Sequence, residues 1–411
     1  MSGSAWEIVD LVARWVHVIA GIMWVGNSLL FNWLDRSLQA PSGSTQTRKP
    51  VGNVWLLHSG GFYYVEKTLL EGQQMPKPMH WFKWQAYTTW LSGLMLLIVV
   101  YWAGGRAVMA DAAVSSLSEQ SAMFVGVGAV FGGWALYEMM NRFVAPKAPT
   151  VSAAVWIGGL IAIAILLTQL IDGRAAFLHV GAMMATIMAG NVFWTIVPSQ
   201  RELVNSVDEG GASASLKALS ARAKRVSIHN NYFTFPVIVL MVSNHFPGIY
   251  GSQLSWALLL ILIAGGAAVR HVLNIRWTFP SWRPALWVTM IATVLLLIGV
   301  MHAANAMSAP TSALGSAASG AASNAPVTFA EVRHIIDRRC TQCHSATPTD
   351  PVFTAAPLGV MFDTPEQIEA RKARILERAV VTKTMPLGNK TGMTEQERAM
   401  LKRWLAAGGR Q

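Results

Sequence analysis

Charged residues and cysteines are both scarce in this chain. Asp, Glu, Lys and Arg make up 13% of its 411 residues, whereas 53% are hydrophobic and 17 are tryptophan. This composition is typical of a membrane protein, in which indole rings gather at both membrane interfaces. The two cysteines leave no second pair to complete a zinc site. The first ten residues lack the basic stretch that opens a secretory signal peptide, so no cleavable leader is expected.

Eight apolar segments are each predicted to cross about 30 Å of hydrocarbon. Pro236 interrupts the sixth, and Pro247 closes it. The segments are residues 11–33, 83–101, 122–144, 152–171, 175–197, 232–245, 254–275 and 284–302. The predicted fold is therefore all-α, with an eight-span transmembrane helical bundle over residues 1–303.

The distribution of basic residues predicts the orientation of the bundle. The odd-numbered connections and their flanks carry fifteen Lys and Arg residues, whereas the even-numbered connections carry only Arg106 and Arg174. The positive-inside rule places the odd-numbered connections in the cytoplasm of a bacterial inner-membrane protein, and an even number of spans then leaves both termini in the periplasm. The same rule accounts for the net charge of +11, so no nucleic-acid partner is expected.

Cys340, Cys343 and His344 form a C-x-x-C-H motif. This spacing is the attachment signature of a c-type haem, in which both thiols bind the porphyrin and the histidine ligates iron. No βαβ pattern surrounds the cysteines, which argues against a redox dithiol. The motif lies in a polar segment, residues 328–411, with helical periodicity at 329–339, 365–380 and 394–407. After an Ala-, Ser- and Gly-rich linker at 304–327, this segment is predicted to be a small, all-α, periplasmic cytochrome c domain.

The sixth iron ligand is expected to be a soft donor such as methionine. Met385 is the preferred candidate because it precedes Pro386 in a loop between two helical stretches. Met393 comes next and Met361 is a third candidate, while core packing is the alternative for each.

The eight spans resemble a parallel repeat of four plus four. Residues 132–141 resemble residues 265–274 at a constant offset, and each stretch opens with Gly-Gly and ends with Asn. Chance similarity among Gly- and Ala-rich helices is the alternative explanation.

Histidines inside the spans are candidates for function. His17 and His179 come from repeat-related spans at similar depth, so they could hold a non-covalent b-type haem. The alternative is that each imidazole donates a hydrogen bond to a neighbouring carbonyl. His245 and His302 lie near span ends and are expected to be interfacial.

A second group lies toward the cytoplasmic ends of the spans. His80, Glu138, His229 and His271 are the candidate catalytic residues there, because a pocket with acid, base and amide groups suits a planar polar substrate. Four asparagines accompany them: Asn141, Asn230, Asn231 and Asn274. The alternative is a set of helix caps and ion pairs, such as Glu138 with Arg142.

The chain resembles the bacterial membrane-bound urate oxidases that are fused to cytochrome c. The resemblance rests on the first span, from Arg14 through His17 to Asn27, and on the segment carrying residues 339–344 and 384–386. It implies oxidation of urate to 5-hydroxyisourate in purine degradation. Electrons would pass through the c-type haem to a respiratory acceptor, such as a soluble cytochrome or a terminal oxidase.

Two other functions remain open from the residues alone. One is a membrane dehydrogenase or quinol oxidase that feeds the same cytochrome with electrons from another small substrate. The other is a transporter or a non-enzymatic electron-transfer subunit, which a parallel repeat would permit.

Overall fold

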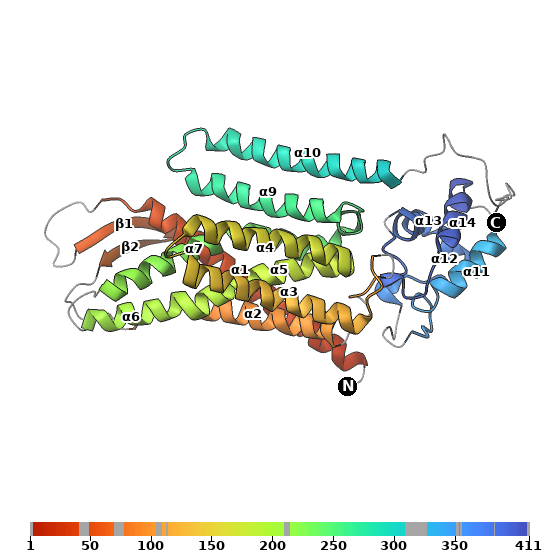
Figure 1. Cartoon of the computed structure of the whole chain (residues 1–411), viewed down its shortest axis with the longest axis horizontal. Helices are drawn as coiled ribbons and strands as arrows, with labels where there is room; N and C mark the ends of the chain where they lie inside the picture. The colour runs from red at the N-terminus through yellow and green to blue at the C-terminus, as the bar shows by residue number, and fades with distance from the viewer. Residues whose placement is uncertain are drawn as a thin grey trace.

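A long helical bundle dominates the computed structural model, which describes residues 3–40, 49–69, 78–103, 109–111, 114–208, 214–308, 327–350, 353, 356–381 and 383–408. Figure 1 shows a β-hairpin at one end of the bundle and the C-terminal segment at the other. The N-terminus lies at the same end as the C-terminal segment (Figure 1).

The bundle contains long helices, several of which continue into π-helical turns. The helices are α1 (Gly3–Ser37), α2 (Trp84–Leu97), α3 (Glu119–Met139), α4 (Pro149–Leu170), α5 (Gly173–Gly190), α6 (Val197–Asp208), α7 (Ala214–Val242), α8 (Pro247–Tyr250), α9 (Ser255–Ile275) and α10 (Trp282–Ser308). The π-helical turns are η1 (Ile98–Trp102) after α2, η3 (Met140–Val144) after α3 and η4 (Asn191–Ile196) after α5. Such turns recur at functional sites, and here η3 and η4 carry the buried residues Asn141 and Asn191.

Seven of the described helical stretches are long and apolar enough to cross a membrane. They correspond to every predicted span except the second. That span forms α2 and η1, which are not among the seven stretches that are long and apolar enough. The first half of α2 is polar, with Gln85, Thr88 and Thr89 close together. The count of eight spans and the parallel repeat of four plus four spans therefore stay predictions.

Helix α5 is the centre of the bundle and is buried along almost its whole length. Small residues bring its neighbours close, as is usual between membrane helices. A Cβ at Gly133 of α3 would overlap the side chain of Met183, and a Cβ at Gly181 would lie 3.2 Å from that of Leu240 in α7. Asp172 starts α5 by accepting a hydrogen bond from the Ala175 amide at 3.1 Å.

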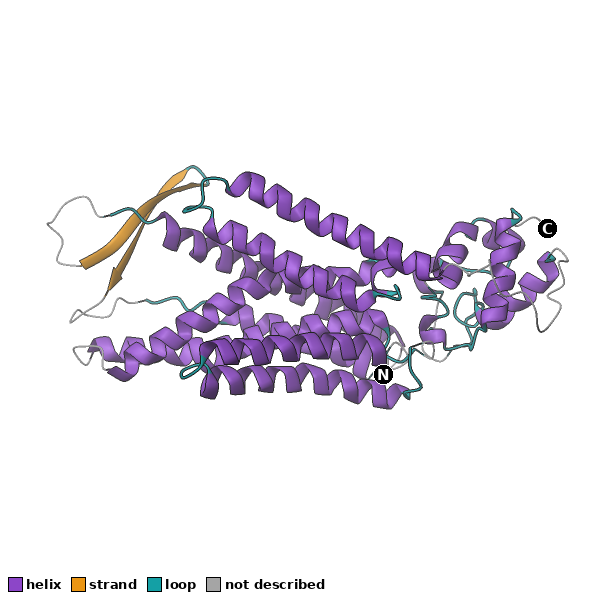
Figure 2. Ribbon diagram, turned by 45° about the horizontal axis from the view of Figure 1, so that its top comes forward, coloured by secondary structure: helices purple, strands orange, loops and turns teal. Residues whose placement is uncertain are grey.

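A two-stranded antiparallel hairpin corrects the prediction of an all-α fold. Strand β1 (Lys49–His58) pairs with β2 (Gly61–Leu69), and Figure 2 shows both strands in orange. The connecting turn at Ser59 and Gly60 has φ of 51° and 76°, as a type I′ turn requires. The hairpin was not predicted because this stretch lies between two spans and carries charged residues, as a connecting loop would.

The C-terminal segment has its own hydrophobic core. Its helices are α11 (Phe329–Arg339), α12 (Pro365–Glu369), α13 (Lys372–Ile375) and α14 (Glu395–Ala406), with shorter turns η6 (Pro357–Gly359), η7 (Leu376–Val381) and η8 (Leu387–Asn389). They surround Ile336, Ile368, Leu401 and Trp404. The elements coincide with the three predicted helical stretches, and capping boxes open α11, α12 and α14. The predicted linker lies outside the described residues from 309 to 326.

Candidate functional site

The C-x-x-C-H motif begins where α11 ends. The amide of Cys340 donates to the Ile336 carbonyl at 2.8 Å, and the amide of His344 donates to the Cys340 carbonyl at 2.9 Å. The two cysteines and the histidine are therefore held on one tight turn. Both thiols are free, and burial raises the pKa of Cys340 to about 12 and that of Cys343 to about 11.

The His344 ring has one nitrogen engaged and one available. Its Nδ1 lies 2.9 Å from the carbonyl oxygen of Val360, which can only accept, so Nδ1 carries the proton. The lone pair of neutral His344 is then on Nε2, the arrangement that a backbone carbonyl imposes on metal-ligating histidines. The motif thus fits a covalent haem, with Cys340 and Cys343 as its attachment points and His344 Nε2 as an axial donor.

The two leading candidates for the opposite ligand lie in different environments. Met393 is 3% exposed and packs in the core of the C-terminal segment, where its amide donates to Asn389 Oδ1 at 2.9 Å. Met385 is partly exposed in the loop before η8, and Arg398 donates to its carbonyl at 2.9 Å. Core packing accounts for Met393, whereas Met385 is not part of this core among the described residues.

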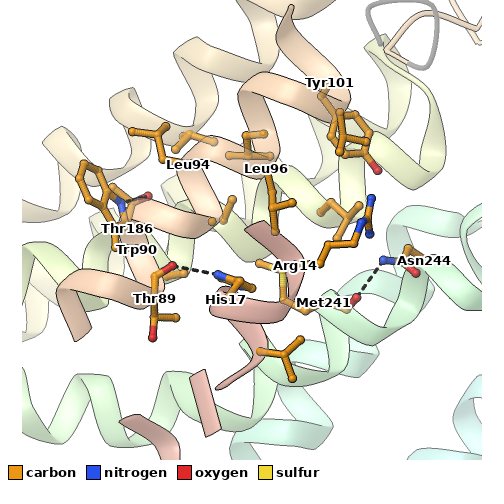
Figure 3. A pocket seen from close by; sticks show the side chains of 18 of the residues that line it. Arg14, His17, Thr89, Trp90, Leu94, Leu96, Tyr101, Thr186, Met241 and Asn244 are labelled. Carbon is orange, nitrogen blue, oxygen red and sulfur yellow. Dashed lines mark hydrogen bonds between the residues drawn. The ribbon is translucent and has the colours of Figure 1, made fainter. Parts of the chain in front are cut away.

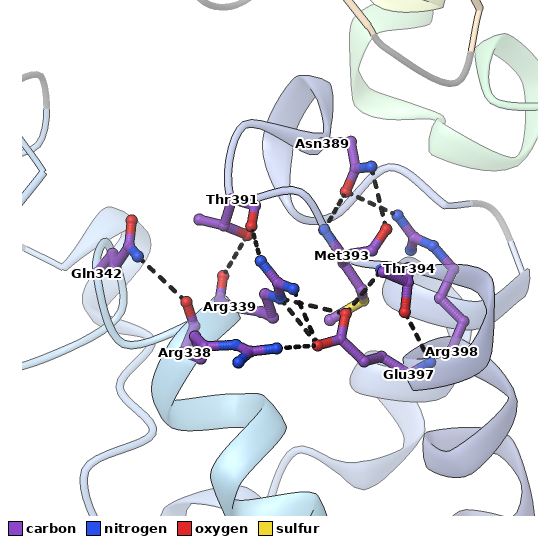
Figure 4. A network of polar contacts seen from close by, with 9 residues as sticks. All are labelled: Arg338, Arg339, Gln342, Asn389, Thr391, Met393, Thr394, Glu397 and Arg398. Atoms are coloured by element: carbon purple, nitrogen blue, oxygen red, sulfur yellow. Dashed lines mark hydrogen bonds and ion pairs between the residues drawn. The ribbon is translucent and has the colours of Figure 1, made fainter.

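One polar network holds the motif and α14 together (Figure 4). Glu397 accepts hydrogen bonds from Arg339, the residue before Cys340, at 3.1 Å and from Arg338 at 3.1 Å. Burial opposes the charged form of Glu397. The Thr394 amide and the two guanidinium groups nevertheless hold its pKa at about 2. Arg398 extends the network by binding Asn389 at 3.3 Å.

A different polar cluster lies where η3 and η4 approach α7. The Nδ2 of Asn191 donates to the Tyr137 hydroxyl oxygen at 3.1 Å and to Asn230 Oδ1 at 2.8 Å. The same hydroxyl lies 2.7 Å from His229 Nδ1. Because Asn191 fills an acceptor position on the phenol, the phenolic proton is free to point at His229. The rings of Trp156 and His229 are 5.8 Å apart and close one side of the cluster.

Buried polar atoms around this cluster lack hydrogen-bond partners among the described residues. They are Asn141 Nδ2, Asn191 Oδ1, Thr195 Oγ1 and Arg222 Nε. Asn141, Asn191 and Thr195 are each at most 3% exposed. Buried groups of this kind are normally satisfied by protein, water or ligand, so this region has hydrogen-bond donors and acceptors left over for water or a bound molecule. The adjoining cavity, lined by Tyr137 and Trp156, measures about 10 Å³ and holds one water at most.

The predicted catalytic residues do not form a single cluster. His229 belongs to the network of Tyr137. Glu138 pairs with Arg222 of α7 at 2.7 Å, rather than with Arg142 as the alternative reading expected. His271 lies 2.7 Å from the Tyr232 hydroxyl on an exposed face, and His80 is exposed beside Phe82.

The four predicted asparagines divide in the same way. Asn230 belongs to the Tyr137 cluster, and Asn141 accepts from Arg225 at 3.1 Å. Asn231 accepts from Asn274 at 2.6 Å and from Arg270 at 3.1 Å, in a separate group between α7 and α9. Tyr137 was not among the predicted site residues, although it directly precedes Glu138 in the stretch that opens with Gly-Gly, and neither was Asn191.

The two histidines proposed for a membrane haem lie in different surroundings. His179 is fully buried, its Nδ1 is 2.7 Å from the Ala175 carbonyl, and its Nε2 accepts from the Trp102 indole at 3.0 Å. Both ring nitrogens of His179 are therefore engaged. His17 instead lines a cavity of about 370 Å³, with its Nδ1 2.9 Å from the Thr89 carbonyl (Figure 3).

The length and composition of the described helices are compatible with a multi-pass membrane protein, and a buried polar cluster lies between them. The model of the urate oxidase N-terminal family matches residues 3–304, so the chain belongs to this family, which is oxidoreductase-like and related to urate. The comparison with curated proteins found no match, and neither did the comparison with solved structures.

Proposed function

We propose that this protein oxidises urate to 5-hydroxyisourate at the membrane. Urate and water would yield 5-hydroxyisourate, two protons and two electrons, so the site needs a proton acceptor and an electron acceptor. The observation that carries the proposal is the family match over residues 3–304, which covers the seven described candidate spans and the whole Tyr137 cluster.

The Tyr137 cluster is the proposed substrate site. Its cavity of about 10 Å³ has room for one water, so urate binding requires the surrounding helices to move apart. Urate is planar and anionic, and it presents both N–H donors and carbonyl acceptors. Asn141 and Arg222 offer unpartnered N–H groups, and Asn191 offers an unpartnered carbonyl oxygen. Arg225 lies one helical turn before His229 on α7 and adds positive charge for an anionic ring.

Proton removal is assigned to Tyr137 and His229. The 2.7 Å contact allows the phenol to pass its proton to His229 Nδ1 while it takes one from the substrate. Asn191, by donating to the phenol oxygen, orients the hydroxyl toward the imidazole and stabilises negative charge as it develops there. The neutral form of His229 is the form that can accept this proton.

Cys340, Cys343, His344 and Met385 would hold the haem, which would supply one-electron chemistry and an outlet to a respiratory acceptor. This chain's own contribution is to fix the donors. Val360 sets the His344 tautomer, and Arg398 holds the Met385 loop. The bacterial inner membrane and a periplasmic location for this segment are part of the proposal.

Detergent-solubilised full-length protein tests the function. With urate and an added soluble cytochrome, we expect loss of urate absorbance together with reduction of the cytochrome. Failure to consume urate with either a cytochrome or a dye acceptor would overturn the proposal. Reduction of the haem by a quinol without urate would favour the alternative quinol oxidase, and urate uptake without redox change would favour a transporter.

A further inference from the structure

The cavity beside His17 lies between α1, α2, α5 and α7 (Figure 3). Its volume of about 370 Å³ falls within the range of roughly 300–1,000 Å³ that is usual for ligand and cofactor sites. Most of its wall is apolar, with Leu94, Leu97, Leu178 and Ala182 among the lining residues. The shape and lining suit a large ligand with an apolar body.

One end of the cavity is cationic. Arg14 of α1 and Arg174 of α5 both line it, together with Tyr101 of η1. The Tyr101 hydroxyl and Arg174 Nε are buried without a hydrogen-bond partner among the described residues, and Tyr101 is only 4% exposed. Arg14 is paired with Asp10 at 2.8 Å, so the unpaired groups that the described residues leave at this end are the Arg174 guanidinium and the Tyr101 hydroxyl. These two donors, with the further N–H groups of Arg14, match a ligand with carboxylates at one edge.

His17 presents a metal-binding nitrogen at the same cavity. Its Nδ1 is 2.9 Å from the Thr89 carbonyl and 3.2 Å from Ser92 Oγ. Since a carbonyl only accepts, the proton is on Nδ1 and the lone pair is on Nε2, for which the described residues provide no partner. This is the same arrangement as that of His344 with Val360. Gly93 lets α2 approach closely, because a Cβ there would lie 2.9 Å from the imidazole.

We propose that this cavity binds a non-covalent b-type haem. The Nε2 of His17 would be an axial iron ligand, and Arg14, Arg174 and Tyr101 would bind the propionates. His245 lines the same cavity and is the candidate for the opposite axial position. His179, the earlier candidate partner of His17, does not line the cavity and has no ring nitrogen free.

This site also offers a route for electrons, and that role rests on the proposed function. The Tyr137 cluster and the C-terminal segment lie toward opposite ends of the bundle, whose hydrocarbon layer is roughly 30 Å thick. A b-type iron would cycle between the ferric and ferrous states, taking one electron at a time from the urate site and giving it to the ferric c-type haem. Two such transfers balance the oxidation of one urate.

Other occupants lack one of the two chemical features. A quinone has an apolar tail and a planar head, but it has no carboxylates for Arg14 and Arg174. A fatty acid or phospholipid has the negative charge but no metal ion to which the imidazole lone pair could bind. A haem is the ligand that uses both.

The test is the ratio of extractable to covalent haem in purified full-length protein. Acidic acetone removes non-covalent haem and leaves the thioether-linked group attached, and pyridine haemochrome spectra identify each. We expect one extractable b-type haem for each covalent haem in the wild type. In His17→Ala the extractable haem should fall at least tenfold while the covalent haem is kept. In Arg174→Gln the extractable haem should fall only in part.

His302→Ala is the matched control, because His302 lies near a span end and does not line the cavity. It should keep both haems. Wild-type protein with only covalent haem would overturn the inference, whether or not the variants fold. So would His17→Ala with a full complement of b-type haem, or extraction of a stoichiometric quinone or lipid instead.

The two proposals fail separately. Wild-type protein that consumes urate but contains only covalent haem would remove the b-type site and leave the function. Protein that contains b-type haem but does not consume urate would remove the function and leave the site.

Discussion

Replacing Tyr137 with Phe tests the proposed chemistry while leaving the packing in place. The change removes the hydroxyl that lies 2.7 Å from His229 Nδ1 and accepts from Asn191 at 3.1 Å, but it keeps the ring that packs 5.5 Å from Trp156. Hydrogen bonds between membrane helices average about 0.6 kcal/mol and reach about 1.7 kcal/mol, so two of them contribute about 1–3 kcal/mol. The variant should therefore remain folded.

Activity should fall much further than stability. A positioned acid–base group contributes roughly 10²–10⁴ in rate, so we expect Tyr137→Phe to lose at least about 100-fold in urate turnover per covalent haem. Thermal unfolding in detergent, measured on the same samples, reports the loss of stability separately.

Tyr232→Phe is the matched control for this prediction. It removes an equal 2.7 Å contact, between the Tyr232 hydroxyl and His271 Nδ1, on an exposed face. We expect it to change turnover by less than about threefold, because that pair lies outside the buried cluster. Equal losses in the two variants, or a Tyr137→Phe enzyme with more than about a third of wild-type turnover, would refute the reasoning.

Three further predictions concern the C-terminal segment. Joint replacement of Cys340 and Cys343 by Ala should abolish covalent haem on a haem-stained gel and abolish cytochrome reduction, while dye-coupled urate oxidation persists. Met385→Leu should change the absorption spectrum and reduction potential of the c-type haem, whereas Met393→Leu should leave both unchanged and lower stability by less than about 1.5 kcal/mol. The lowered pKa of Glu397 stabilises the folded state above its ordinary pKa of 4.5. That stability, at most about 3 kcal/mol, is lost as the pH falls toward 2, so Glu397→Gln should flatten an acid titration of the haem absorbance in this range.

Local patterns in the sequence predicted most of the helices. The length of the apolar runs predicted seven stretches that the structure also shows as long apolar helices. The helical periodicity after residue 328 predicted α11 and α14. The β1–β2 hairpin was not predicted because its strands lie between two spans, in a stretch whose charged residues are typical of a loop. The second span was harder to judge because Thr88 and Thr89 make its first half polar.

The candidate sites could be predicted from the sequence only in part, because a sequence shows contiguous motifs but not the contacts between distant residues. The C-x-x-C-H motif is contiguous, so its residues could be named directly. The Tyr137 cluster joins α3, η4 and α7, and its contacting residues Tyr137 and His229 are 92 positions apart, so no local spacing reveals which partner each will meet. His17 and His179 were predicted to lie at similar depth in the membrane. The Trp102 indole donates a hydrogen bond to His179 Nε2, and only the folded chain shows this contact.

Anaerobic addition of limiting urate to the purified protein tests the central claim most directly. With excess soluble cytochrome as acceptor, we predict that the covalent haem is reduced first and that two equivalents of cytochrome are then reduced for each urate consumed. In air, the same stoichiometry should hold without oxygen uptake. Urate consumption that requires oxygen and leaves the haem at Cys340 and Cys343 oxidised would contradict the account.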